Sequence, residues 1–292
     1  MKMRTRTLRR IGYTLLSLGL CIAAAATSLT LSDERKAGAV PAPEGMLYIP
    51  AGRYIPLYAT PADTGSTPVE PFFLDAYAVT NADYLDFVKA NPPWRRSKAK
   101  RLFVDDGYLK NWQGDLDFGP DSLANRPAVN VSWFAASAYA RWKGKRLPTT
   151  AEWELAAAAS ATRPDGSSDP AYGQHILDWY SRRAPSVLPP VGSTFRNYWG
   201  AYDLHGLVWE WVLDFNTSLV TGESRNDSDL DLKLFCGTGS VGASSFDDYA
   251  AFIRFAFRSG LEAAYTVSNL GFRLAQDAPI QTSSQITERN ES

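Results

Sequence analysis

The chain has 292 residues, of which 45% are hydrophobic and 21% charged, and its formal net charge is −1. This balance is typical of a globular protein and excludes wholesale disorder and a collagen-like repeat. The two cysteines exclude a disulfide framework and a cysteine-rich zinc site, and the two histidines exclude a multi-histidine copper, iron or zinc centre.

The N-terminal segment predicts export. Residues 1–10 carry five basic side chains and no acid, and residues 11–31 carry no charge. A basic stretch before an apolar one is typical of an export signal. Residues 1–39 are therefore interpreted as this signal and a linker, with cleavage near 26 or 39, and the protein is expected in the periplasm. The apolar stretch can also cross a membrane if it is not cleaved, and a twin-arginine route through Arg9-Arg10 stays open.

Without residues 1–39 the chain is acidic. Those residues hold seven of the 30 Lys and Arg and two of the 31 Asp and Glu, which leaves 23 basic and 29 acidic side chains and a net charge of −6. An acidic body argues against nucleic acid as a partner. A membrane is expected to meet the protein only through an uncleaved N-terminal segment.

The first half of the folded chain predicts two strands and a helix. Strands are expected over residues 47–50 and 72–79. Thr80 is a suitable N-cap for a helix that runs to Lys89. Residues 92–128 are rich in Gly, Pro, Asp and Trp and predict mostly loop.

The second half predicts two further helices and then irregular structure. Ser132 caps a helix over residues 133–143, and Thr149 or Thr150 caps one over residues 151–159. Residues 160–175 are expected to form a polar loop, and residues 176–275 contain many turns and few long periodic segments. The tail, residues 277–292, is polar and expected to be flexible.

Three stretches match motifs of a known family. They are residues 128–154, with Asn130-Val131-Ser132-Trp133 and Arg146-Leu147-Pro148-Thr149; residues 200–211, which end in Trp209-Glu210-Trp211; and residues 269–273, Asn269-Leu270-Gly271-Phe272-Arg273. Together they resemble the formylglycine-generating-enzyme, or sulfatase-modifying factor, family. The resemblance implies one α+β domain over residues 40–276, loop-rich and C-type-lectin-like, but it does not fix the reaction.

The chain departs from the family's copper-binding pattern. Formylglycine generators resemble one another in a pair of cysteines that binds Cu(I) through two soft thiolates. The matching positions here are about Ser245 and Ala250, neither of which has a thiol. No copper is expected, and the chain is not expected to generate formylglycine.

The resemblance is closest to a periplasmic branch that lacks the cysteine pair and matures pyoverdine. It implies a periplasmic maturation enzyme, an oxidoreductase that converts the dihydropyoverdine chromophore to pyoverdine in siderophore biosynthesis. The substrate would be a small-molecule or peptide siderophore. Two alternatives stay open: an accessory protein of copper nitrite reductase in denitrification, and a binding module without catalysis.

Two arginines are the leading site candidates. Arg254 and Arg258 lie four residues apart among several phenylalanines. One interpretation is structural, with each arginine paired to a buried carboxylate and stacked on rings. The resemblance places this segment beside the substrate groove, and it assigns Arg254 to substrate binding and Arg258 to catalysis. Fixed guanidinium groups suit a carboxylate or a catecholate-like anion.

The remaining groove candidates are a phenol, a carboxylate and two indoles. Tyr249 and Asp248 follow a glycine-rich run, in the segment that carries the chemistry of the cysteine-containing relatives. A phenol and a carboxylate can transfer protons, so both are predicted to be catalytic, with a solvated turn as the alternative. Trp133 or Trp199 is predicted to form a stacking wall for the substrate.

Glu210 is the candidate metal ligand. Many family members bind structural Ca²⁺ with the matching glutamate, and carboxylate oxygens suit Ca²⁺. Leu207 stands where the family has an asparagine, so a buried carboxylate paired with an arginine is weighed equally. Apart from this calcium site no cofactor is assigned, and Cys236 is interpreted as a small buried apolar residue.

Overall fold

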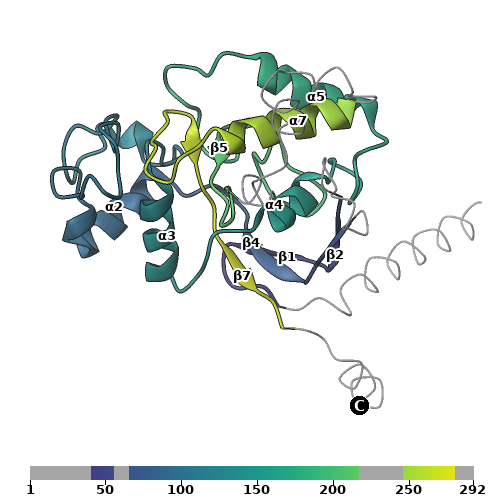
Figure 1. Cartoon of the computed structure of the whole chain (residues 1–292), viewed down its shortest axis with the longest axis horizontal. Helices are drawn as coiled ribbons and strands as arrows, with labels where there is room; N and C mark the ends of the chain where they lie inside the picture. Colours follow the sequence, from purple (N-terminus) through teal and green to yellow (C-terminus); the bar gives the residue numbers. More distant parts are fainter. Residues whose placement is uncertain (1–40, 56–65, 217–245, 280–292) are drawn as a thin grey trace, which may run out of the picture. The chain divides into compact units, whose positions relative to one another are not determined.

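The computed structural model describes residues 41–55, 66–216 and 246–279 (Figure 1). The predicted export signal, Cys236, Ser245 and the tail from residue 280 lie outside these residues. From Ala42 onward the described residues belong to one compact unit. Short strands, helices and long loops alternate in it, so the predicted loop-rich, single α+β domain is confirmed.

Three small sheets frame the domain. The largest has the order β1-β4-β7 with both pairs antiparallel, and Leu74 of β4 lies opposite Leu47 on one side and Ala275 on the other. An antiparallel pair, β2-β3, and a parallel pair, β5-β6, form the other two. The strands are Met46–Ile49 (β1), Gly52–Tyr54 (β2), Thr67–Val69 (β3), Phe72–Asp75 (β4), Trp209–Glu210 (β5), Leu270–Gly271 (β6) and Ala275–Asp277 (β7).

The described helices are capped where the sequence predicts caps. Thr80, Ser132 and Thr149 each accept a hydrogen bond from the backbone N–H three residues on, which satisfies a donor that the first turn leaves free. The helices are Asn81–Ala90 (α2), Trp133–Trp142 (α3), Thr150–Ala157 (α4), Pro170–Ser181 (α5) and Phe246–Ser259 (α7), with 3-10 turns at Pro92–Trp94 (η1) and Asp121–Leu123 (η2).

The structure corrects three sequence-based predictions. The strand predicted over residues 72–79 ends at Asp75, since Val79 exchanges hydrogen bonds with the loop residues Phe272 and Ala128 instead. The last six residues of the loop predicted over residues 160–175 are helical instead, because Asp169 caps a helix, α5, that begins with Pro170. The region predicted to be irregular, residues 176–275, contains α7.

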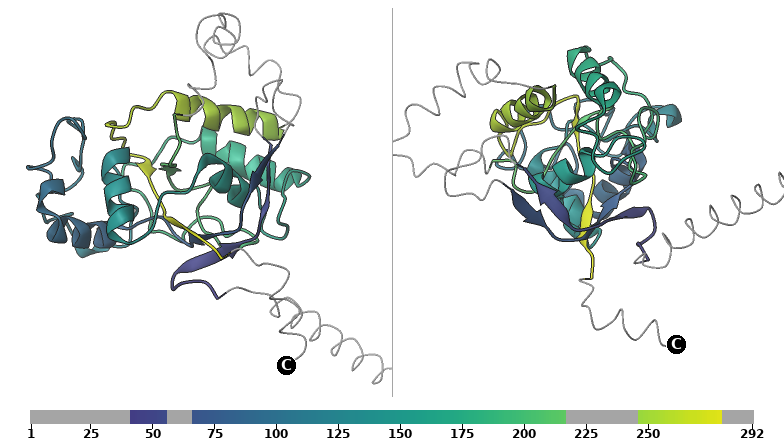
Figure 2. Two further views of the ribbon diagram at one scale, coloured as in Figure 1. Left: turned by 60° about the horizontal axis from the view of Figure 1, so that its bottom comes forward. Right: turned by 90° about the vertical axis from the view of Figure 1, so that its right-hand side faces the viewer.

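Helix α7 owes its conformation to packing. It lies against α5, and its buried Ala250 contacts a cluster with Tyr172 and Ile176 of that helix. Figures 1 and 2 both place α5 and α7 together, on the side of the domain away from the β1-β4-β7 sheet. The aromatic residues of α7 have modest helix propensity, so tertiary contacts decide this helix.

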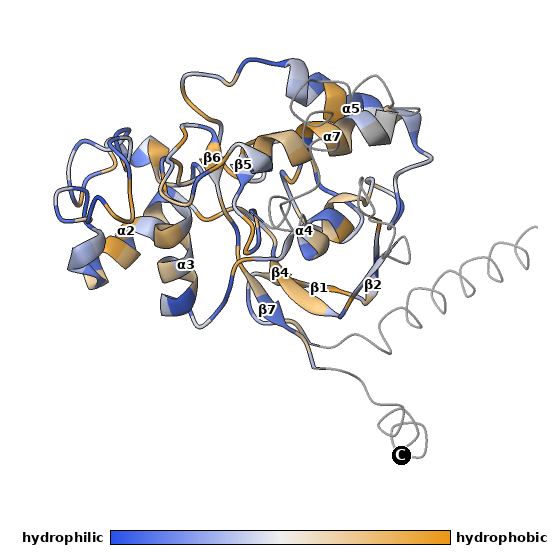
Figure 3. Cartoon of the chain, in the orientation of Figure 1, coloured by the Kyte–Doolittle hydropathy of each residue, from blue (hydrophilic) through white to orange (hydrophobic). Residues whose placement is uncertain are grey.

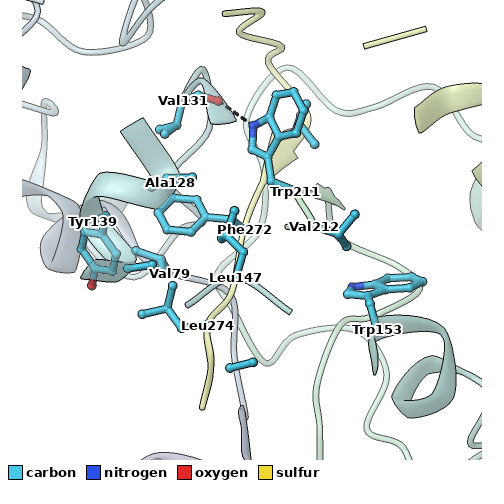
Figure 4. Close-up of a cluster of buried hydrophobic side chains, with 14 of the residues drawn as sticks. Val79, Ala128, Val131, Tyr139, Leu147, Trp153, Trp211, Val212, Phe272 and Leu274 are labelled. Atoms are coloured by element: carbon cyan, nitrogen blue, oxygen red, sulfur yellow. Dashed lines mark hydrogen bonds between the residues drawn. The ribbon is translucent and has the colours of Figure 1, made fainter. Parts of the chain in front are cut away.

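The core is built largely from rings. Trp211, Tyr84, Phe72 and Phe272 are among the largest fully buried side chains. Figure 4 shows Phe272 between Ala128 and Leu147, and the Trp211 indole above them donates to the Val131 carbonyl oxygen over 2.8 Å. A partner for a buried indole N–H is what a ring-rich core requires.

The folded chain extends slightly beyond residue 276. Strand β7 runs to Asp277, and Ala278 is buried. In the described part of the chain, every helix is too short or too polar to cross a membrane.

Candidate functional site

A buried glutamate of α4 binds both arginines of α7. Arg254 donates to Glu154 from Nε over 2.9 Å to each carboxylate oxygen, and its Nη2 lies 2.8 Å from Oε2. The Arg258 Nη1 atom donates to Oε1 over 2.6 Å. The side chains are only 11%, 11% and 8% exposed for Arg254, Arg258 and Glu154. Each arginine is therefore paired with a buried carboxylate, as one of the two interpretations of the sequence predicts.

Aromatic rings enclose this ion-pair group. The Tyr180 hydroxyl accepts a hydrogen bond of 3.1 Å from Arg254 Nη1, and the Arg258 guanidinium lies over the Trp153 ring, 5.0 Å from its centroid. Tyr180 stacks on Trp209 with centroids 5.1 Å apart, and Phe257 stacks on Trp209 at 4.2 Å. Glu154, Arg254, Arg258, Tyr180 and Trp153 are called the arginine cluster below.

The cluster carries an excess of positive charge. Burial alone would raise the pKa of Glu154, but the two guanidinium groups outweigh burial and lower the pKa to about 2. Burial would lower the pKa of Arg254, and Glu154 raises it instead. One carboxylate thus faces two guanidinium groups. Burial and the nearby Glu154 raise the pKa of Tyr54 on β2 to about 12, so this phenol stays protonated beside the cluster.

The two arginines differ in how completely they are bonded. All three nitrogens of Arg254 are engaged, by Glu154 and Tyr180. Arg258 uses only Nη1, and within the described residues its Nε and Nη2 have no hydrogen-bond acceptor. Arg258 therefore retains donors for an anionic or carbonyl-bearing ligand.

Glu210 is held by an arginine. Arg273 Nε donates to both Glu210 oxygens, over 3.0 and 2.8 Å, and Nη2 donates to Oε1 over 2.8 Å. The Trp153 indole donates to Oε2 over 2.8 Å. Both charged side chains are fully buried. Glu210 is thus paired with an arginine, as one of its two alternatives predicts. The described residues contain no group of three or more His, Cys, Asp or Glu placed to hold a metal ion.

The other predicted site residues do not meet in one place. Trp133 opens α3, donates to the Val212 carbonyl oxygen over 3.0 Å and packs on Phe215. Trp199 lies in a loop beside Tyr198, and its buried Nε1 has no acceptor among the described residues. Tyr249 is 40% exposed in the first turn of α7. Asp248 belongs to the same turn, and its side chain lies outside the described part.

The sequence predicts no site role for Glu154, Tyr180 or Tyr54. The sequence does contain a pattern that points to a partner such as Glu154. On a helix, Arg254 and Arg258 share one face. Two cations on a buried face require a carboxylate from another element. The pattern needs α7 to be recognised as a helix. Glu154 also lies 100 residues before Arg254 in the chain, where no local pattern connects them.

His205 lies in a turn and is buried in the core. Its ring is fully buried, with Trp153, Tyr172 and Tyr180 at its edges. Nε2 bonds to the Ala157 carbonyl oxygen over 3.2 Å, and in the part of the chain that the structure describes Nδ1 has no partner. Because the carbonyl accepts, Nε2 carries the proton. Burial and the positive charge of Arg254 lower the pKa of His205 to about 3.

The short sheets, capped helices, ring-rich core and buried Glu210–Arg273 pair define a loop-rich α+β domain of the formylglycine-generating-enzyme type. Residues 32–278 match the family described as the sulfatase-modifying factor enzyme 1-like domain, and the chain belongs to this family.

Known relatives agree with this assignment. The chain is 33% identical to the formylglycine-generating enzyme of Streptomyces coelicolor, over 77% of this chain and 85% of that protein. It is 33% identical to serine/threonine-protein kinase pkn1 of Chlamydia caviae over 49% of this chain, but it spans only 23% of the kinase. Among solved structures, PvdO from Pseudomonas aeruginosa matches with a TM-score of 0.39 and 20% identity, over 80% of this chain and 94% of that one. A likeness of this extent carries no argument about function.

The donor set does not fit the copper ion of formylglycine generators. Cu(I) requires soft thiolate ligands, and Cys21 and Cys236 are the chain's two cysteines. Ala250, at one of the matching positions, is buried among apolar side chains of α5 and cannot coordinate a metal. No step of the chemistry proposed below passes through copper.

Proposed function

We propose that this protein is a periplasmic maturation enzyme that oxidises the dihydropyoverdine chromophore to pyoverdine. The observation that carries the proposal is the incompletely bonded Arg258, which lies over Trp153 in a cluster with excess positive charge. A flat, catechol-like ring bears oxygens that such a guanidinium can bind, and its faces suit stacking on aromatic side chains. The missing thiol pair supports a reaction different from formylglycine formation.

In the proposed reaction the chromophore ring loses two protons and two electrons. We propose dioxygen as the acceptor, which is reduced to hydrogen peroxide. Arg258 would donate hydrogen bonds from Nε and Nη2 to the substrate oxygens and stabilise the anion formed when the first proton leaves. Tyr249 and Asp248 lie in the first turn of α7 and Arg258 in its last, so they are proposed to move that proton only in a substrate that extends along this helix. Trp133 and Trp199 stay the proposed stacking residues.

The test is deletion of the gene in the organism that carries it. The deletion strain should secrete a siderophore heavier by two hydrogen atoms and without the mature fluorescence. Wild-type protein should restore the mature siderophore, as should the exposed control Arg182→Lys. Arg258→Lys should not, although the folded protein accumulates. A deletion strain with an unchanged siderophore would refute the proposal.

A binding module without catalysis is the second candidate. The bonding of Arg254 favours it, because Glu154 and Tyr180 engage all three nitrogens and leave fewer of the five N–H groups for a substrate. Purified protein mixed with the dihydro-chromophore distinguishes the two. An enzyme consumes dioxygen and releases hydrogen peroxide with repeated turnover, whereas a binding module changes only its tryptophan fluorescence. A deletion strain with normal siderophore and impaired nitrite reduction would instead favour the denitrification accessory role.

Export is part of the proposal. The basic and then apolar residues 1–31 support it. Fractionation of cells should place the protein in the periplasm, with an N-terminus near residue 26 or 39 when the signal is cleaved. A cytoplasmic protein that keeps residue 1 would contradict this.

A further inference from the structure

A strongly basic loop follows α2 and η1. Residues 95–101 hold five cations, Arg95, Arg96, Lys98, Lys100 and Arg101, and no acid. The rest of residues 40–292 is acidic: without these five cations it holds 18 basic and 29 acidic side chains, a net charge of −11. Residues 95–102 are called the basic loop below. It belongs to the long, largely hydrophilic connection between α2 and α3 (Figure 3).

The basic loop is fixed to the domain rather than loose. Arg96 Nη1 donates to the Trp112 carbonyl oxygen over 2.9 Å. The Ser97 backbone N–H and hydroxyl donate to Asp115 over 2.7 and 2.6 Å. At its two ends the rings of Trp94 and Phe103 pack on each other and against the main core. The loop therefore presents its charges in a set arrangement.

Few acids neutralise the outward charges. Asp106 pairs with Arg101, and both side chains are exposed. Asp115 accepts hydrogen bonds from Ser97 and also feels the charges of Arg95 and Lys98, and Asp105 accepts hydrogen bonds from Gly107 and Thr266. Within the described residues, the exposed Lys98 and Lys100 form no direct ion pair. Both ammonium groups can therefore contact an external anion.

An apolar side chain projects beside these cations. Leu102 is 75% exposed, whereas the next residue, Phe103, packs on Phe134 with ring centroids 5.3 Å apart. Leu102 and Phe103 both lie in a turn, and of the two Leu102 is the exposed one. An exposed leucine next to three cations has no role in folding that the structure displays.

We infer that the basic loop docks the protein onto an anionic phospholipid surface. Lys98, Lys100 and Arg101 contact the headgroups, and Leu102 enters the boundary between headgroups and acyl chains. The leucine favours lipid over an acidic protein segment or a nucleic acid, because only lipid offers an apolar layer directly beneath a sheet of negative charge. This contact is separate from any anchoring by residues 1–39.

The basic loop and the arginine cluster share no residue. In Figure 1 α2, which precedes the loop, lies at the left of the domain and α5 at its upper right. Lipid binding and turnover are therefore expected to respond to different substitutions.

The experiment measures partition of the full-length protein between buffer and vesicles. Vesicles of phosphatidylglycerol and phosphatidylcholine are compared with vesicles of phosphatidylcholine alone. The double variant Lys98→Gln/Lys100→Gln should bind the anionic vesicles about thirtyfold less tightly at low salt, at about 1 kcal/mol per cation. The matched control Arg182→Gln/Arg183→Gln removes the same charge from exposed positions after α5 and should bind nearly as the wild type does.

The remaining variant distinguishes a lipid surface from other anionic partners. Leu102→Ser keeps every charge and should weaken binding to anionic vesicles severalfold. Every variant carries the same N-terminal segment, so the ratio of wild-type to variant affinity for anionic vesicles cancels the contribution of that segment. Equal weakening in the loop and control variants would overturn the inference. So would a Leu102→Ser variant that binds as tightly as wild type, because a purely ionic partner would then suffice.

Discussion

Arg254 and Arg258 share one carboxylate but are bonded to different extents. Arg254 binds Glu154 and Tyr180 with all three nitrogens, and Arg258 binds Glu154 with one. Lysine retains the charge of arginine but not its planar fork. The consequence of an Arg-to-Lys change should therefore differ between the two positions.

Arg254→Lys should lower the free energy of unfolding by about 2–3 kcal/mol, because hydrogen bonds to charged groups are lost in a buried setting. Arg258→Lys should cost about 1 kcal/mol, since an ammonium group can replace its single bond to Glu154. Urea denaturation of the two variants at neutral pH measures both values. Equal losses would mean that Arg258 has further partners in the fold.

His205 should make the stability of the protein depend on pH. Its pKa is lowered from 6.5 to about 3 by burial and then by Arg254. The unfolded state therefore takes up a proton at a pH where the folded state does not. The contribution to stability is complete above pH 6.5 and is lost as the pH falls toward 3.

Between pH 6.5 and 4.5 the free energy of unfolding of the wild type should fall about 2 kcal/mol further than that of His205→Gln. Glutamine can still donate to the Ala157 carbonyl oxygen but does not titrate. Urea denaturation at each pH gives the difference. Parallel pH curves for wild type and His205→Gln would show that His205 is not the titrating group.

At the scale of elements, Arg146 joins the start of α4 to the last strand. Its Nη2 lies 2.6 Å from Glu152 in the first turn of α4 and 2.6 Å from Asp277 at the end of β7. The backbone of Arg146 also bridges Ala275. Glu152 is mostly buried and completes the capping box with Thr149, whereas the Asp277 side chain is 84% exposed.

Glu152 and Asp277 both bind Arg146 but differ in burial, so removing the charge of each should change stability to a different extent. Glu152→Gln should lower the free energy of unfolding by about 2 kcal/mol, because a partly buried charged hydrogen bond and a cap are both weakened. Asp277→Asn should cost about 0.5 kcal/mol or less, as expected of an exposed ion pair. Thermal unfolding of the two variants measures the difference. If Asp277→Asn lowered the free energy of unfolding more than Glu152→Gln, the ion pair of Arg146 with β7 would contribute more to stability than its ion pair with α4.

At the scale of the whole molecule, the cysteine content decides the metal chemistry. Cys21 and Cys236 lie more than two hundred residues apart, and the buried Ala250 of α7 offers no ligand. Two soft thiolates are what tight Cu(I) binding requires. The molecule therefore has the family's fold without the family's metal-binding pair.

Full-length protein should leave Cu(I) with a competing bathocuproine chelator and should not convert a sulfatase peptide of the form Cys-x-Pro-x-Arg. The Cys236→Ser variant should behave identically, which tests whether this single thiol contributes. Absorbance of the copper–chelator complex and peptide mass measure the two outcomes. Stoichiometric Cu(I) uptake together with peptide oxidation would contradict the argument.

The sequence by itself determined the features that depend on near neighbours. Thr80, Ser132 and Thr149 each cap a helix through a bond to the third residue on, and such a bond is encoded in a few consecutive letters. The family motifs likewise identified the fold over nearly the whole folded chain.

Only the tertiary structure decided α7 and the partners of the buried charges. Helix α7 forms because α5 packs against it, although its aromatic residues favour a helix only weakly. Glu154 meets arginines 100 and 104 residues away, and Glu210 meets Arg273 63 residues away. The physical reason is the same in each case: burying a charge demands a partner, but which partner is determined by the path of the whole chain and not by any local pattern.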